Sequence, residues 1–127
     1  MSARVMHFEI PFDDGDRARG FYSKAFGWQV MPVPDMSYTL VMTGPSGDQG
    51  PTEIGFINGG MMQRQEPFTA PNIVIDVANL EDALKAVNEA GGTTVSERQA
   101  VGDMGFVAYF KDTEGNLIGI WENAPAG

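Results

Sequence analysis

An internal repeat constrains the fold of this chain more than any other feature of its sequence. When residues 7–30 are moved along by 65 positions, they align with residues 72–95 without a gap. Because both segments also carry the same succession of apolar patterns, we expect two copies of one folding unit. The identical pairs in this alignment are Ile10/Ile75, Ala18/Ala83, Ala25/Ala90, Gly27/Gly92 and Val30/Val95.

Each copy predicts the order β-α-β-β-β. Apolar residues first alternate, as a strand with two different faces requires. A capping residue follows, Asp14 or Asn79, and then helical spacing that ends at Gly27 or at Gly91-Gly92. The three strands expected after each helix are GWQVMPV, YTLVM and EIGFING in the first copy, and TTVSERQ, GFVAYF and NLIGIWEN in the second.

These patterns predict a single α+β domain over residues 1–127, made of two βαβββ modules. Module one is expected at about 4–62 and module two at about 70–123. A single helix covers only one face of each sheet, so two curled mixed sheets placed together would enclose a concave groove for a small ligand. The residues predicted to bind that ligand are His7, Glu9, Asn72, Trp121, Tyr38 and Phe106.

The charge and composition narrow the range of partners. The formal net charge of -9 disfavours nucleic acid and anionic membranes, and it favours a cationic ligand. The absence of cysteine excludes disulfides, thiolate metal sites and cysteine nucleophiles. No apolar run approaches the roughly 20 residues of a membrane span, and the start of the chain lacks a signal-peptide core. We therefore expect a cytoplasmic protein.

Two stretches resemble the vicinal oxygen chelate superfamily, which includes glyoxalase I, extradiol dioxygenases and bleomycin-resistance-type binding proteins. They are HFEIPFDD…RARGFYSKAFGW near the start and FKDTEGNLIGIWE near the end. The resemblance extends from about Val5 to Glu122 and implies the paired-module fold and a homodimer. It leaves open whether modules pair within or between chains, and it does not specify a reaction, because this fold hosts many.

The resemblance also suggests where a metal would bind. Metal-dependent members take ligands from the first and last strand of each module, which here correspond to His7, Gly55, Asn72 and Gly119. Only His7 is a good ligand, since glycine has no side chain and an amide oxygen is a weak donor. Catalytic divalent metals usually need three or more His or carboxylate ligands. We therefore expect no metal cofactor. Glu122, three residues after Gly119, should face away from the groove.

Several residues remain open to more than one interpretation. His7 could be a hydrogen-bonded structural residue, a ligand-binding or acid–base group, or a metal ligand. Trp121 could belong to the core or to the ligand wall. The stretch GGMMQR from Gly59 could form a lid, a dimer contact or plain core.

The function predicted from these residues is a metal-free small-molecule-binding protein of the glyoxalase/bleomycin-resistance type, with its ligand in the groove between the modules. The alternative is a glyoxalase-like lyase or isomerase that uses His7 and Glu9 as acid–base groups, with or without a non-standard divalent metal site. A structural or regulatory dimer with an unused pocket is a third interpretation. The choice between binding and catalysis stays open at this point.

Overall fold

The computed structural model describes residues 3–34 and 36–125, and it divides into two compact units. One unit is formed by His7–Pro71 and holds the elements of module one. The other runs from Asn72 onward and holds those of module two, together with the first residues of the first strand. No helix among the described residues is long and apolar enough to cross a membrane.

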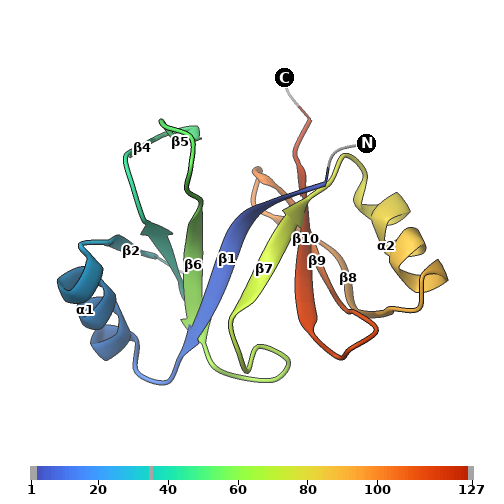
Figure 1. Ribbon diagram of the computed structural model, residues 1–127, viewed down its shortest axis with the longest axis horizontal. Coiled ribbons are helices and arrows are strands. Elements are labelled where there is room, and N and C mark those ends of the chain that lie inside the picture. The colour runs from blue at the N-terminus through green and yellow to red at the C-terminus, as the bar shows by residue number, and fades with distance from the viewer. Residues whose placement is uncertain (1–2, 35, 126–127) are drawn as a thin grey trace. The chain divides into compact units, whose positions relative to one another are not determined.

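Module one has the predicted order of elements, and Figure 1 shows its helix on one side of its own strands. The strands follow the order β2-β3-β6-β1, with β1 and β6 parallel and the other pairs antiparallel. A short ribbon of two strands, β4 and β5, lies in the connection before β6. The bounds are β1 Arg4–Phe12, α1 Gly15–Phe26, β2 Gln29–Val33, β3 Tyr38–Met42, β4 Ser46–Gly47, β5 Gly50–Pro51 and β6 Asn58–Gln63.

Module two repeats this topology. Its strands follow the order β7-β10-β9-β8, again with the first and last strands parallel and the others antiparallel. The helices begin at Gly15 and Leu80, which are 65 positions apart, as the repeat requires. The prediction of two βαβββ modules is therefore confirmed. The bounds are β7 Asn72–Asp76, α2 Leu80–Glu89, β8 Thr93–Val101, β9 Gly105–Lys111 and β10 Leu117–Asn123.

Both helices begin at the capping residues that the sequence indicated. The Asp14 carboxylate accepts a hydrogen bond from the Arg17 backbone N–H at 3.0 Å, and the Asn79 side chain accepts one from Asp82 at 2.9 Å. Each satisfies a backbone donor that has no partner within its helix. The first helix ends at Gly27, whose φ of 71° is the left-handed conformation that glycine adopts without strain.

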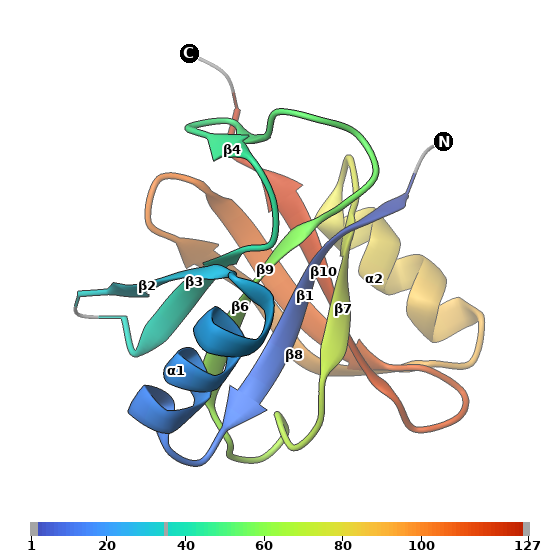
Figure 2. The ribbon, with the colours of Figure 1, turned by 60° about the vertical axis from the view of Figure 1, so that its left-hand side comes forward.

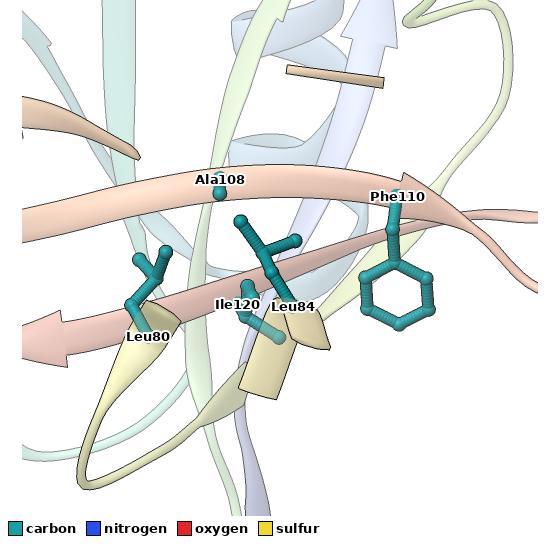
Figure 3. Close-up of a cluster of buried hydrophobic side chains, with 5 residues drawn as sticks. All are labelled: Leu80, Leu84, Ala108, Phe110 and Ile120. Atoms are coloured by element: carbon teal, nitrogen blue, oxygen red, sulfur yellow. The ribbon is translucent and has the colours of Figure 1, made fainter. Parts of the chain in front are cut away.

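The best-packed core belongs to module two. Leu80 and Leu84 of α2 lie against Ala108 and Phe110 of β9 and Ile120 of β10 (Figure 3), and none of the five is more than 9% exposed. Leu80 and Leu84 are four residues apart, so they fall on the same side of the helix. Burial of this apolar face holds α2 to its sheet.

The last strand of module one differs from the prediction. The sequence predicted a strand over EIGFING, but β6 spans Asn58–Gln63, and Gly55 lies in a bend with a φ of 107°. The register shows the true counterpart of Gly119. In module two, Gly119 is paired with Val74, and in module one the equivalent of Val74, which is Glu9, is paired with Gly60. Gly60 is therefore the counterpart of Gly119. The metal position that the resemblance assigned to Gly55 therefore falls outside the sheet.

Glycine occurs within β6 because neighbouring rings occupy the space of a side chain. A Cβ on Gly59 would lie 2.5 Å from the Phe8 ring, and one on Gly60 would lie 1.9 Å from the Tyr38 hydroxyl. The next residue, Met61, is fully buried. The GGMMQR stretch is therefore not a lid: its first five residues belong to β6, and Gly59, Gly60 and Met61 are buried.

We expect Leu80→Ala to lower the free energy of unfolding by about 2–5 kcal/mol, because Leu80 is fully buried and its loss leaves a cavity. Leu40→Ala is the matched control, since Leu40 is 38% exposed and should cost less than about 1 kcal/mol. Urea unfolding of both variants measures the difference. Equal losses would contradict this account of the core.

Candidate functional site

Three polar side chains of module one form a connected group. His7 and Glu9 lie two residues apart on β1, and Tyr38 stands at the start of β3. The Tyr38 hydroxyl lies 2.8 Å from His7 Nε2, and it donates a hydrogen bond to Glu9 Oε2 at 3.0 Å. Glu9 is only 5% exposed, and His7 is partly buried. We call these three residues the His7–Tyr38–Glu9 cluster.

The cluster lies on the sheet face opposite α1. Phe8 and Phe12, which alternate with its members along β1, point to the other side. There the Phe8 ring packs against Trp28 with centroids 5.8 Å apart, and the Phe12 ring lies 5.8 Å from the Arg19 guanidinium. The period of two along β1 therefore puts His7 and Glu9 on the face that α1 does not cover.

Gly60 makes the cluster possible. In the sheet, β6 runs between β1 and β3, and Gly60 is paired with Glu9 on one side and Leu40 on the other. Tyr38 must cross above β6 to reach β1. Any side chain at position 60 would occupy the place of the Tyr38 hydroxyl, from which a Cβ would be only 1.9 Å away.

The hydrogen bonds fix which nitrogen of His7 carries the proton. Tyr38 has one hydroxyl proton and donates it to Glu9, so its oxygen accepts from Nε2–H of His7. Burial lowers the pKa of His7 to about 4, and the imidazole is therefore neutral at pH 7. A neutral imidazole with its proton on Nε2 presents Nδ1 as a hydrogen-bond acceptor.

Asn72 occupies the position in module two that His7 has in module one. It is 6% exposed, and neither atom of its amide group has a hydrogen-bond partner among the described residues. A buried amide without partners costs free energy, which is why such groups usually meet water or a ligand. The role of Asn72 in binding a ligand therefore stays a prediction, and its unpartnered amide is consistent with one.

Trp121 is only partly buried. Its indole N–H donates to Asn123 Oδ1 at 2.9 Å, and its ring covers Gly105, where a Cβ would come within 2.5 Å. The indole nitrogen therefore already has a partner on the same strand. The ring remains a candidate for apolar contact with a ligand.

Phe106 does not lie where the sequence analysis placed it. It packs against the core beneath α2, and the Arg98 guanidinium lies over its ring at 3.6 Å. The register pairs Phe106 with Glu122, which accepts a hydrogen bond from the Leu80 backbone N–H at 2.8 Å. Glu122 thus faces the helix, as its spacing from Gly119 predicted, and Phe106 shares that side.

Tyr109, which was not among the residues predicted from the sequence, is the aromatic residue of β9 that does share the face of Gly119. These two residues are paired in the sheet, and a Cβ on Gly119 would lie 3.0 Å from the Tyr109 ring. The turn KDTEGN in the sequence could have indicated that Tyr109 lies opposite Gly119. Counting back from a hairpin closed between Asp112 and Asn116 pairs Tyr109 with Gly119.

Comparisons with known proteins agree with the fold. A family model described as bleomycin resistance protein-like N-terminal matches residues 4–44. A glyoxylase-like domain-containing protein from Didymella fabae is 30% identical over 127 residues, which is 94% of each chain. This chain belongs to the vicinal oxygen chelate superfamily.

Solved structures with the superfamily's fold are similar along nearly the whole chain. A glyoxalase/bleomycin resistance protein/dioxygenase superfamily member from Vibrio splendidus 12B01 has a TM-score of 0.65 at 16% identity, covering 96% of this chain and all of that one. Methylmalonyl-CoA epimerase from Mycobacterium tuberculosis has a TM-score of 0.64 at 17% identity, covering 95% and 88%. At these identities the likeness concerns the fold alone.

The residues present do not fit the metal site of the superfamily's metal-dependent members. Among the described residues, no three His, Cys, Asp or Glu side chains lie together in a way that could hold an ion. His7 and Glu9 are joined through a tyrosine hydroxyl. The expected ligand position on the last strand, Gly55, lies outside the sheet, and the residue that takes its place in the register, Gly60, has no side chain either. Two potential ligands fall short of the three that catalytic metals usually require.

The pKa of His7 predicts a pH dependence of stability. Between pH 6.5 and about 4 the unfolded chain binds a proton at His7 that the folded chain does not, so stability falls as the pH drops. The loss reaches about 3 kcal/mol at most. We expect the advantage of wild type over His7→Gln in urea unfolding to shrink between about pH 7.5 and 4.5. An advantage that is constant with pH would contradict the lowered pKa.

We expect Gly60→Ala to displace the Tyr38 hydroxyl and to break both hydrogen bonds of the cluster. The loss in unfolding free energy should be about 1–3 kcal/mol. The ring nitrogens of His7, followed by NMR, should also lose their fixed tautomer. Gly20→Ala is the control, because a Cβ there meets nothing within 4 Å, and alanine in a helix should be neutral or stabilising. An unchanged tautomer in Gly60→Ala would show that Gly60 is not needed for the cluster.

Proposed function

We propose that this protein binds a small organic molecule at the His7–Tyr38–Glu9 cluster without a resident metal, as bleomycin-resistance-type proteins do. One observation carries the proposal: the Tyr38 hydroxyl holds a neutral His7 on the sheet face opposite α1, and Nδ1 of His7 has no hydrogen-bond partner among the described residues. A preformed acceptor of this kind selects a ligand group that can donate a hydrogen bond, such as an N–H or O–H.

The neighbouring side chains favour an apolar ligand body. A row across the sheet runs from Glu9 through Gly60 to Leu40 and then Met31, each paired with the next. Leu40 and Met31 are 38% and 43% exposed. Exposed apolar groups beside a fixed polar cluster are the usual composition of small-molecule sites.

The charge of the chain favours a cationic ligand. Its net charge of -9 creates a negative potential, which raises the local concentration of cations. We therefore propose a cationic, partly aromatic molecule with an N–H or O–H donor. Bleomycin free of metal, named in the description of the matching family, is a suitable first probe.

Calorimetry and thermal shift with this probe and other cationic aromatic compounds test the proposal. A binder should raise the melting temperature, because it stabilises only the folded state. We expect Glu9→Gln to weaken binding by about 10-fold or more, since it alters the buried partner of Tyr38. Glu97→Gln removes the same formal charge from an exposed position and should have little effect. Equal effects of the two variants would indicate that only overall charge matters.

Metal analysis tests the other half of the proposal. Protein purified without chelator should contain far less than one equivalent of Zn, Ni, Mn or Fe, because His7 and Glu9 supply only two potential ligands. Added metal should leave the affinity for the organic probe unchanged. A stoichiometric metal that is lost in His7→Gln would overturn the metal-free interpretation.

Proton transfer by a lyase or isomerase is the second candidate, and the hydrogen-bonded chain from His7 to Glu9 favours it. The pKa of His7 weighs against it: at about 4, it lies about three units below neutral pH, which makes the imidazole a weak base. Methylmalonyl-CoA, named for a structural neighbour, is a suitable test substrate. Deuterium uptake from D2O at its acidic carbon, lost in His7→Gln, would favour catalysis over binding.

A further inference from the structure

Module one has a cavity on the opposite side of its sheet from the His7–Tyr38–Glu9 cluster. Its volume is about 350 Å³, and the apolar residues that line it include Ile10, Phe12, Ala18, Tyr22 and Met61. Figure 2 shows α1 following directly from the end of β1. The volume lies within the range of small-molecule sites.

The two helices differ in what they bury against their sheets. The core of module two is filled by Leu80 and Leu84, whose counterparts 65 positions earlier are Gly15 and Arg19. Gly15 has no side chain to insert, and Arg19 donates hydrogen bonds to Thr39 Oγ1 at 3.1 Å and to Asp16 at 2.7 Å. No residue of α1 is fully buried. The Arg19 guanidinium occupies the space beside Gly15, and the hollow is lined by other residues of α1: Arg17, Ala18, Phe21 and Tyr22.

Charged side chains stand at the rim of the cavity, and most of them have partners. Arg64 bonds to the Asp13 carboxylate at 2.9 Å and to a backbone carbonyl at 2.6 Å. Asp14 accepts from the backbone N–H of Arg17. The Arg17 guanidinium makes no ion pair or side-chain hydrogen bond among the described residues, and it also lines the cavity.

We propose that this cavity is a second ligand site, for a compact apolar monocarboxylate. The ring or branched chain of such a ligand would fill the space beside Phe12 and Tyr22, and its carboxylate would pair with Arg17. The carboxylates of Asp13 and Asp14 at the rim disfavour a second negative charge on the ligand. The site is separate from that of the proposed function, since the two lie on opposite faces of the sheet.

NMR titration of the full chain with three matched probes tests the proposal. Phenylacetate, phenylacetamide and phenethylamine share a phenyl group and differ in charge. We expect phenylacetate to shift the backbone amides of α1 and of the end of β1 in a saturable way. Its affinity should exceed that of the neutral amide by about 10-fold, because only the anion pairs with Arg17.

Two variants separate a ligand site from a gap in packing. Arg17→Gln removes the cation at the rim and should abolish the preference for the anion, whereas Lys24→Gln removes a cation from the last turn of the same helix and should keep it. Ala18→Leu fills the cavity and should abolish binding of all three probes. His7→Gln should leave phenylacetate binding unchanged.

Three results would overturn the proposal. The first is the absence of any saturable shift at α1 in the folded protein at millimolar phenylacetate. The second is an equal affinity for the three probes, which would leave Arg17 without a role. The third is a set of shifts centred on His7 and Tyr38 and lost in His7→Gln, which would assign the binding to the first site.

Discussion

The Tyr38 hydroxyl, lying above Gly60 between β3 and β1, holds the proposed site together. It bonds both His7 and Glu9, and it determines which nitrogen of the imidazole carries a proton. The burial that lowers the pKa of His7 also keeps the ring neutral, so that Nδ1 can accept a hydrogen bond from a ligand. A glycine in the middle of a strand weakens that strand, and here the loss is offset by the space it provides for the tyrosine.

The two modules have the same topology but differ in how their helices pack against their sheets. In module two, α2 inserts Leu80 and Leu84 into a closed core. In module one, Gly15 and Arg19 occupy the corresponding positions, and the helix stands over an open cavity. Both of the sites that we propose are therefore in module one, one on each face of its sheet. A repeated fold allows this division, because one copy can supply the packed core while the other carries polar groups and space.

Much of the fold could be predicted because it depends on short-range patterns. The capping residues, the helical spacing and the alternation along β1 are local, and the structure confirms them at Asp14, Asn79 and Phe8. The face of Glu122 also followed from counting along one strand. The predicted strand at EIGFING was wrong, because the strand lies further along the chain, at Asn58–Gln63, and includes two glycines that carry no apolar signal. The partner rings that replace the missing side chains of Gly59 and Gly60 come from residues far away in the sequence.

The sequence by itself determined that the chain is a duplicated βαβββ unit, and that His7 and Glu9 share one face of the first strand. A repeat and a period of two are properties of neighbouring residues, so they need no knowledge of the folded chain. Only the tertiary structure decided that Tyr38 joins these two residues and that Phe106 packs against the core beneath α2. Those outcomes depend on the register between strands, which is set by hairpin geometry and packing across the sheet and not by any single segment.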